Sequence, residues 1–130
     1  MSEQLLLDTN VLIWTLSESD RISAQAKRAM SRSASHLFVS VISVWEMILK
    51  HQAGKLDLQA PMEDVINQIL YQSQWQILPV RTGHMVPLLS LPMIHKDPFD
   101  RMLIAQARLE GMALVTSDKT IAEYNLKIIW

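Results

Sequence analysis

Two short apolar runs, near opposite ends of the chain, each end close to an aspartate and lead into a segment with helical character. Residues 5–7 are followed directly by Asp8, and residues 113–115 are followed shortly by Asp118. A continuous apolar run bounded by polar residues is typical of a strand that is buried on both faces of a parallel sheet. Open α/β sheets bind ligands beyond the carboxyl ends of their strands, so both aspartates are expected at that edge.

The size and composition of the chain favour one globular domain that spans residues 1–130. A chain of 130 residues, 49% of them hydrophobic, can bury a core without covalent cross-links. The lack of cysteine excludes disulfides, zinc–thiolate sites and thiol catalysis. No apolar run approaches the roughly 18 residues of a membrane span, and no secretory signal is evident. We therefore expect a cytoplasmic protein that does not enter a membrane.

The charge balance neither favours nor excludes a nucleic-acid ligand. Twelve Lys and Arg residues oppose thirteen Asp and Glu residues, and the formal net charge is −1. A nucleic-acid binder often has a basic excess, which this chain lacks as a whole. If four acids gather in one metal site, however, nine acids remain against twelve bases.

Strand-like and helix-like segments alternate along the chain. The predicted strands are 4–7, 36–40, 75–80, 112–116 and 126–129. The predicted helices are 8–16, 23–30, a segment from Ser40 or Ser43 to about 53, 62–73, part of 82–90, 97–110 and 118–123. Pro87 should end or bend its helix, whereas Gly54 and Gly111 should close two others. The alternation predicts a three-layer α/β/α domain with a mostly parallel sheet of four or five strands.

Two further acids, Glu46 and Asp100, lie on the apolar faces of predicted helices. The neighbours of Glu46 at helical spacing include Ile42 and Leu49, and Asp100 shares a face with Leu103. An isolated carboxylate on a buried face is too costly unless it is paired or coordinated. Both acids are therefore candidates for the same site as Asp8 and Asp118.

Each of the four acids also has a plain structural explanation. Asp8 and Asp118 could cap the helices that follow them. Glu46 has the spacing of a capping box with Ser43. Asp100 could simply favour the positive end of a helix that Asp97 caps and Pro98 begins.

A cluster of these four acids would call for a divalent cation. Carboxylates held close together repel one another, which raises some of their pKa values, and no basic residue is evident within the cluster. Oxygen-only ligands favour Mg²⁺ or Mn²⁺ over zinc. A water on such an ion is a suitable nucleophile for attack on a phosphodiester. The scattered histidines show no ligand spacing and are expected at the surface or in turns; they are His36, His51, His84 and His95.

With these acids placed, the chain resembles the PIN-domain family and, within it, VapC-type toxins of toxin–antitoxin pairs. The resemblance spans essentially the whole chain and rests on four motifs in order, at residues 6–12, 43–46, 95–107 and 114–118. It implies a metal-dependent ribonuclease that cuts single-stranded or loop RNA. It also implies a homodimer that a small antitoxin protein silences.

The resemblance further implies roles for individual residues. Asp8 and Asp100 would bind the metal directly, and Asp118 and Glu46 would complete the metal site through water. The hydroxyl residues beside the acids would help to orient the site; they are Thr9 and either Thr116 or Ser117. From their positions next to the acids, Lys96, Arg101 and Lys119 are candidates for contacts with RNA.

Other features have a structural explanation first and a functional one second. The four tryptophans are expected in the core, although Trp14 and Trp45 lie near site elements and could stack on a base. Residues Ile13, Leu16 and 66–70 could form an exposed apolar face for a dimer or an antitoxin.

Two other functions are weighed against the nuclease. One is a different Mg²⁺-dependent phosphate-transfer enzyme on a similar sheet. Asn10 stands where an aspartyl-phosphate phosphatase would have its second aspartate, and Val80-Arg81 stands where a receiver domain would have its own. The other is a non-catalytic module of similar fold, in which the acids bind basic residues of a protein partner.

Overall fold

The computed structural model describes residues 3–32 and 35–130, and at its centre lies a five-stranded sheet. The strands are β1 (Glu3–Leu7), β2 (Ser35–Ser40), β3 (Gln76–Leu78), β4 (Ala113–Val115) and β5 (Ile128–Ile129). They lie in the order β3-β2-β1-β4-β5, and each neighbouring pair is parallel. The predicted parallel α/β sheet is therefore confirmed.

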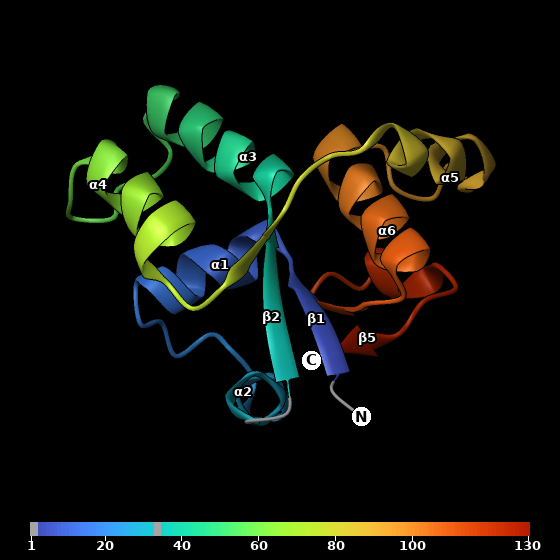
Figure 1. Cartoon of the computed structure of the whole chain (residues 1–130), viewed down its shortest axis with the longest axis horizontal. Helices are drawn as coiled ribbons and strands as arrows, with labels where there is room; N and C mark the ends of the chain where they lie inside the picture. The colour runs from blue at the N-terminus through green and yellow to red at the C-terminus, as the bar shows by residue number, and fades with distance from the viewer. Residues whose placement is uncertain (1–2, 33–34) are drawn as a thin grey trace.

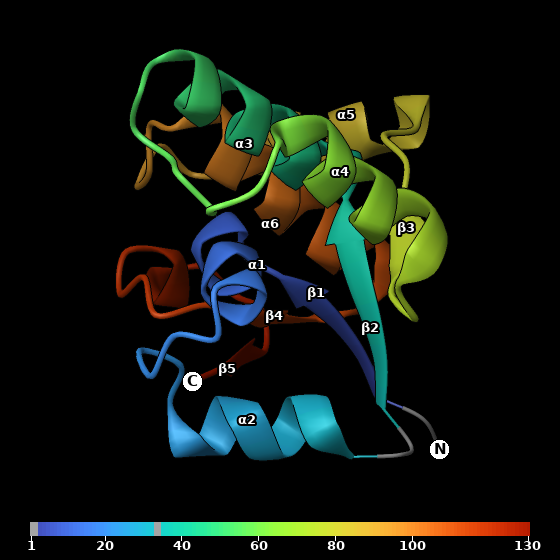
Figure 2. The same ribbon diagram turned by 90° about the vertical axis from the view of Figure 1, so that its left-hand side faces the viewer.

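Helices cover both faces of this sheet. They are α1 (Thr9–Leu16), α2 (Ala24–Ser31), α3 (Val41–Gln52), α4 (Met62–Asn67), α5 (Met85–Ser90) and α6 (Pro98–Glu110). Figure 1 shows α1, α3 and α4 on one side of the strands and α5 and α6 on the other. In the view of Figure 2, α2 lies at the end of the molecule opposite α3 and α4. Within the described ranges, no helix is long and apolar enough to cross a membrane.

The alternation of side chains along β1 explains why both faces need a cover. Leu5 and Leu7 point into the core cluster that also contains Met47 of α3, whereas Leu6 joins Leu103 of α6 in a second cluster. All five side chains are fully buried. Burial of one such side chain stabilises the fold by about 2 kcal/mol, so the apolar run holds the two helical layers together.

The ends of α6 follow the sequence prediction. The side chain of Asp97 accepts hydrogen bonds from the N–H groups of Phe99 and Asp100, at 2.8 and 3.1 Å. Pro98 occupies the first turn, where its missing N–H costs no hydrogen bond. Gly111 ends the helix with φ +68°, a conformation that glycine adopts without strain. These ends fix the position of Asp100 in the first turn.

Some predicted helix boundaries are wrong. Helix α5 continues through Pro87, because this residue lies in the first turn, where backbone N–H groups have no partner within the helix. The predicted helix at 62–73 changes to π-helical geometry over Gln68–Gln72. The predicted helix at 118–123 is only a 3₁₀ turn over Ile121–Glu123. A second 3₁₀ turn, Thr82–His84, leads into α5.

The strand order determines where a ligand site can form. The chain moves from β1 to β2 and β3 on one side, and then returns to β4 and β5 on the other side of β1. Strand β1 is therefore the point at which the direction of the connections reverses. Ligands of open α/β sheets bind in the crevice beyond the carboxyl end of such a strand. The residue immediately after β1 is Asp8.

Candidate metal centre

Asp8 lies beyond the carboxyl end of β1 and is almost completely buried, with 5% of its surface exposed. Its backbone N–H donates to the carbonyl oxygen of Val115 at 3.0 Å, and its Oδ2 accepts a hydrogen bond from Thr116 Oγ1 at 2.7 Å. Asp8 stands at the N-cap position of α1, but its side chain makes no capping hydrogen bond. Capping therefore does not explain this buried carboxylate.

The environment of Asp8 disfavours its charged form. Burial raises the pKa of Asp8, and the charges of Glu46 and Asp118 add to this effect, while the hydrogen bond from Thr116 opposes it. A cation near Asp8 would lower this pKa again, because it would compensate the negative charge that water no longer solvates.

Glu46 projects from α3, and the structure excludes the capping box proposed for it. The helix begins after Ser40, whose side chain accepts the N–H of Ile42 at 3.1 Å. Ser43 therefore lies inside the helix, where its Oγ accepts a hydrogen bond from Thr9 Oγ1 at 2.9 Å. Thr9 and Ser43 thereby join the starts of α1 and α3.

The two carboxylate oxygens of Glu46 have different surroundings. Oε2 lies 3.4 Å from Nζ of Lys50, one turn later on α3, and Lys50 also donates to Asn10 at 3.4 Å. Oε1 is buried and has no hydrogen-bond partner in the described ranges 3–32 and 35–130. A buried acceptor without a partner is costly, and a metal-bound water or a cation would satisfy it.

Asp100 and Asp118 face each other across the crevice. Asp118 follows β4, and its Oδ1 accepts the N–H of Thr120 at 2.8 Å, so one oxygen shapes a turn. Its Oδ2 lies 3.1 Å from His95 Nε2, and a ligand oxygen of Asp118 lies within 4.8 Å of one of Asp100, which is in the first turn of α6. The turn explanation thus accounts for only one of the two oxygens of Asp118.

The pKa of Asp100 shows how strongly the acids influence one another. Burial, as the largest cause, and the charges of Asp8, Asp97 and Glu46 together raise it to about 7, while His95 acts in the opposite direction. Because the charge of Glu46 affects the pKa of both Asp8 and Asp100, the carboxylate that follows β1 and those on α3 and α6 lie in one region. Convergent oxygen ligands at a strand edge form a suitable site for a hard divalent cation.

His95 is the residue in this centre that the sequence prediction missed. Its Nε2 lies 3.0 Å from Oδ2 of Asp100 and 3.1 Å from Oδ2 of Asp118. The expected surface or turn position is correct for the backbone, because His95 lies in the loop before α6, but the side chain is only 17% exposed. The expectation of an acidic cluster without a basic residue is therefore wrong, since His95 and Lys50 both contact it.

The hydroxyl and basic residues proposed beside the acids differ in their exposure to solvent. Thr116 is buried against Asp8, whereas Ser117 is exposed. Lys96 and Lys119 are exposed, and each is a near neighbour in sequence of a site acid.

Arg101 is used differently from the proposed contact with RNA. Its guanidinium donates to the backbone carbonyl oxygens of Leu88, Leu91, Pro92 and His95 at 2.9 to 3.4 Å. Five N–H donors on a rigid plane suit such multiple contacts. The structure thus gives Arg101 a clear role in holding the loop between α5 and α6.

The tryptophans are only partly in the core. Trp14 packs against Trp130 with ring centroids 5.8 Å apart, and Trp75 borders the same core cluster. Trp45 is 54% exposed, so the expectation of a core position is wrong for it. Its ring meets that of Phe99 edge-to-face at 5.0 Å, which joins α3 to α6 beside Glu46 and Asp100.

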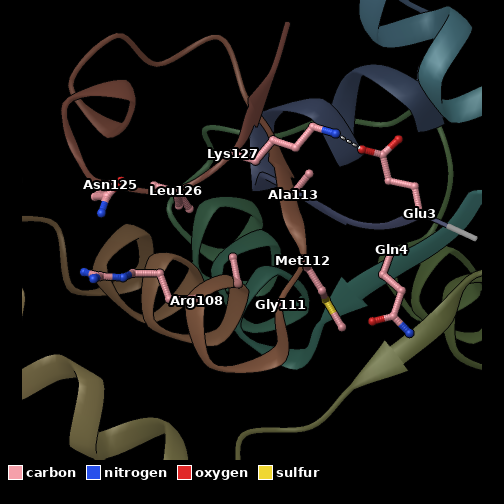
Figure 3. Close-up of a pocket in the computed structure, with 10 residues that line it drawn as sticks. Glu3, Gln4, Arg108, Gly111, Met112, Ala113, Asn125, Leu126 and Lys127 are labelled. Carbon is pink, nitrogen blue, oxygen red and sulfur yellow. Dashed lines mark hydrogen bonds and ion pairs between the residues drawn. The ribbon is translucent and has the colours of Figure 1, made fainter. Parts of the chain in front are cut away.

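A groove of about 530 Å³ lies at the opposite edge of the sheet (Figure 3). It is lined by residues at the amino ends of β1, β4 and β5, among them Gln4, Arg108 and Met112. An ion pair between Glu3 and Lys127 lies at its side. The groove is therefore separate from the acidic centre, which lies beyond the carboxyl ends of the strands.

The family model described as "PIN domain" matches residues 5–127 of the chain. Ribonuclease VapC22 of Mycobacterium tuberculosis is 29% identical over 126 residues, which cover 92% of this chain and 91% of that protein.

Solved structures of similar fold include bacterial VapBC complexes and a bacterial toxin. The VapBC2 complex of Rickettsia felis, bound to a DNA fragment from its promoter, contains a chain with a TM-score of 0.70 at 15% identity, covering 96% of both chains. A chain of the DNA-bound VapBC complex of Salmonella typhimurium has a TM-score of 0.69 at 21% identity, covering 98% of this chain and 97% of that one. VapC20 of Mycobacterium tuberculosis, a toxin that cleaves the sarcin–ricin loop, has a TM-score of 0.63 at 16% identity. The match covers 92% of this chain and 95% of that one.

Proposed function

This chain belongs to the PIN-domain family, and from that premise we propose that it is a metal-dependent endoribonuclease and the toxin of a toxin–antitoxin pair. The observation that carries the proposal is the convergence of Asp8, Glu46 and Asp100, from three different elements, next to Asp118. The similarity to a protein named as a ribonuclease supports RNA as the substrate. An RNA substrate would place the activity in the cytoplasm.

The residues of the centre fit a hard divalent cation. The buried Oε1 of Glu46 lacks a partner among the described residues, and burial raises the pKa values of Asp8 and Asp100. Asp8 and Asp100 would hold the ion directly, and Glu46 and Asp118 would hold its waters. When bound, Mg²⁺ or Mn²⁺ supplies an activated water and stabilises negative charge on the phosphodiester.

The chain's own side chains would then orient the reaction. Thr116 fixes Oδ2 of Asp8 through a 2.7 Å hydrogen bond, which would orient the carboxylate toward a bound ion. Oε1 of Glu46, which has no partner among residues 3–32 and 35–130, would accept a hydrogen bond from a water. Lys96 and Lys119, both exposed near the acids, would bind phosphates of the RNA.

Metal removal tests this function. The purified chain should cleave an RNA that contains unpaired loops in Mg²⁺ or Mn²⁺, and EDTA should abolish the cleavage. Addition of excess Mg²⁺ should restore it, since EDTA removes only the metal ion and leaves the carboxylate ligands intact. The measurement is the rate of appearance of new 5′ and 3′ ends on a labelled RNA.

Persistent cleavage in EDTA would contradict the metal-dependent mechanism. Lack of cleavage with every divalent ion, together with metal-independent binding of a basic protein partner, would favour the non-catalytic module instead. A contaminating ribonuclease is excluded when an Asp8→Asn preparation, purified in parallel, lacks the activity.

We further propose a protein partner and a second copy of the chain. The structural neighbours include toxin–antitoxin complexes, which supports a small cognate antitoxin that covers the acidic centre.

For the homodimer, the structure offers an apolar surface on α5 and its neighbours, formed by Met85, Val86, Leu89, Met93, Ile94 and Leu109. We refer to it as the α5 surface.

The α5 surface replaces the apolar face that the sequence suggested. Ile69 is fully buried, and Ile13, Leu16 and Ile66 pack against the core, so that segment offers no continuous exposed face. On the α5 surface, Leu89 is 90% exposed and Val86 is 68% exposed. Apolar side chains gathered in this way are typical of a contact site between proteins.

Leu89→Glu should convert a dimer into a monomer. A charge at the centre of an apolar interface would have to be desolvated without a partner, which weakens association by several kcal/mol. Sedimentation equilibrium measures the change in mass. Tyr71→Glu, at a residue that is 79% exposed outside the α5 surface, is the control and should leave the dimer intact. A dimer that survives Leu89→Glu would contradict the proposed surface.

A further inference from the structure

Hydrogen bonds hold both the backbone and the imidazole ring of His95. Its backbone N–H donates to Tyr124 Oη at 2.8 Å, and its carbonyl oxygen accepts from Arg101 at 3.3 Å. On the ring, Nδ1 accepts the backbone N–H of Asp97 at 3.1 Å. The imidazole therefore cannot turn away from the crevice without loss of a hydrogen bond.

These contacts assign the position of the ring hydrogen. Because Nδ1 accepts an N–H, it must present a lone pair, so the hydrogen of the neutral imidazole lies on Nε2. That hydrogen bonds to Oδ2 of Asp118 at 3.1 Å, and Oδ2 of Asp100 lies 3.0 Å from the same nitrogen. His95 Nε2 thus lies between a carboxylate of α6 and a carboxylate from the turn after β4, and contacts both.

The position of this hydrogen shows whether the imidazole can act as a metal ligand or as a hydrogen-bond donor. The ligand atoms of His95, Asp100 and Asp118 lie within 4.8 Å of one another, so distance alone would allow all three to bind one ion. A metal-bound histidine needs a free lone pair on the ligating nitrogen and usually donates its other N–H to an acceptor. Here the other nitrogen faces a donor, the N–H of Asp97, which is the opposite arrangement.

We infer that His95 is a positioning residue that orients Asp100 and Asp118 through Nε2–H and stays outside the inner coordination shell of the metal. The inference rests on the proposed function for the metal itself. It leaves the ion an oxygen-only ligand set, which favours Mg²⁺ or Mn²⁺ over zinc. It also explains why the loop before α6 is fixed so firmly by Arg101 and Tyr124.

Two substitutions at His95 separate a donor from a ligand. The Nε2 of glutamine can occupy the place of the imidazole Nε2 and donate to both carboxylates, whereas alanine removes the donor. We expect His95→Ala to weaken Mn²⁺ binding about 10- to 100-fold, the usual effect of losing a residue that supports metal ligands. His95→Gln should stay within a few-fold of the unsubstituted chain. His51→Ala, at an exposed position on α3, is the matched control and should leave the affinity unchanged.

Electron paramagnetic resonance of Mn²⁺ gives both readouts in one sample. Titration of the free-ion signal yields the affinity, and electron spin-echo modulation detects a nitrogen bound directly to manganese. The inference predicts no modulation from a coordinated imidazole nitrogen in the unsubstituted chain. Such modulation, lost in both His95 variants, would overturn the inference and make His95 a ligand. Unchanged affinity in His95→Ala would also overturn it.

A measurement without metal keeps this inference distinct from the proposed function. In EDTA, His95→Ala should lower the thermal unfolding midpoint of the chain, and this loss should largely disappear when Asp100 and Asp118 are both asparagine, since the carboxylate charges are then gone. An equal loss in both backgrounds would contradict a link between His95 and these acids. If the link is present but Mn²⁺ fails to bind the unsubstituted chain, the metal centre is wrong and the positioning role of His95 stands.

Discussion

Asp8→Asn should reduce the rate of RNA cleavage by at least about 100-fold, which is the upper end of the effect of losing a residue that only supports metal ligands. Asparagine preserves the shape of the side chain and can still accept the hydrogen bond that Thr116 donates to Asp8 at 2.7 Å. It lacks the charge that a divalent cation requires at the centre of the site. The fold should be unaffected, because the buried carboxylate is destabilising without metal.

The measurement for this variant is kcat/KM on a labelled RNA, with circular dichroism as the test of folding. Asp64→Asn, at an exposed residue in the first turn of α4, is the matched control and should cleave at the normal rate. Equal activity of Asp8→Asn and the unsubstituted chain would show that the acidic centre is not the active site.

The second large effect is on the stability of the metal-free protein. The pKa of Asp100 rises from an ordinary 3.8 to about 7 in the folded chain. Between these values the folded state binds more protons than the unfolded state, so the free energy of unfolding falls as pH rises. Because solvent screens part of the charge of Asp100, we expect a loss of about 2 kcal/mol or more between about pH 4 and pH 7. Burial raises the pKa of Asp8 as well, and its contribution has the same sign.

Urea denaturation in EDTA at several pH values measures this effect most clearly as a difference between two proteins. Asp100→Asn removes the titrating carboxylate, so its stability relative to the unsubstituted chain should increase from pH 4 to pH 7 and then level off. Asp64→Asn should show no such trend. If Asp100→Asn gains no stability relative to the unsubstituted chain at pH 8, Asp100 is not the strained carboxylate that its surroundings indicate.

The raised pKa of Asp100 also predicts how the metal affinity depends on pH. A cation needs the ionised form of Asp100, so metal affinity should rise with pH up to about 7. The carboxylates that would bind the ion therefore also lower the stability of the metal-free chain, as is common at functional sites.

Much of this arrangement follows from local sequence patterns. The apolar run at residues 5–7 predicts a buried strand, and the structure places it at the centre of a parallel sheet. Asp97 and Gly111 mark the ends of α6 because N-caps and left-handed C-terminal residues have strong local preferences. The acids on the apolar faces of α3 and α6 stand out because burial of an unpaired carboxylate is costly.

The features that were missed depend on contacts between distant segments. His95 carries no ligand spacing in the sequence, and only the packing of Tyr124 and Arg101 against its loop brings the ring to Asp118. Arg101 looked like a free cation beside a site acid, but it satisfies carbonyl oxygens of the loop before α6. Pro87 looked like a helix breaker because its place within the first turn of α5 could not be known.

The central claim is that the four carboxylates bind one hard cation at the carboxyl end of β1. A crystal grown with Mn²⁺ and measured near the manganese absorption edge tests it most directly. We predict an anomalous peak within coordination distance, about 2.0 to 2.3 Å, of carboxylate oxygens from Asp8 and Asp100. No peak among Asp8, Glu46, Asp100 and Asp118, at a concentration of Mn²⁺ that supports RNA cleavage, would contradict the claim.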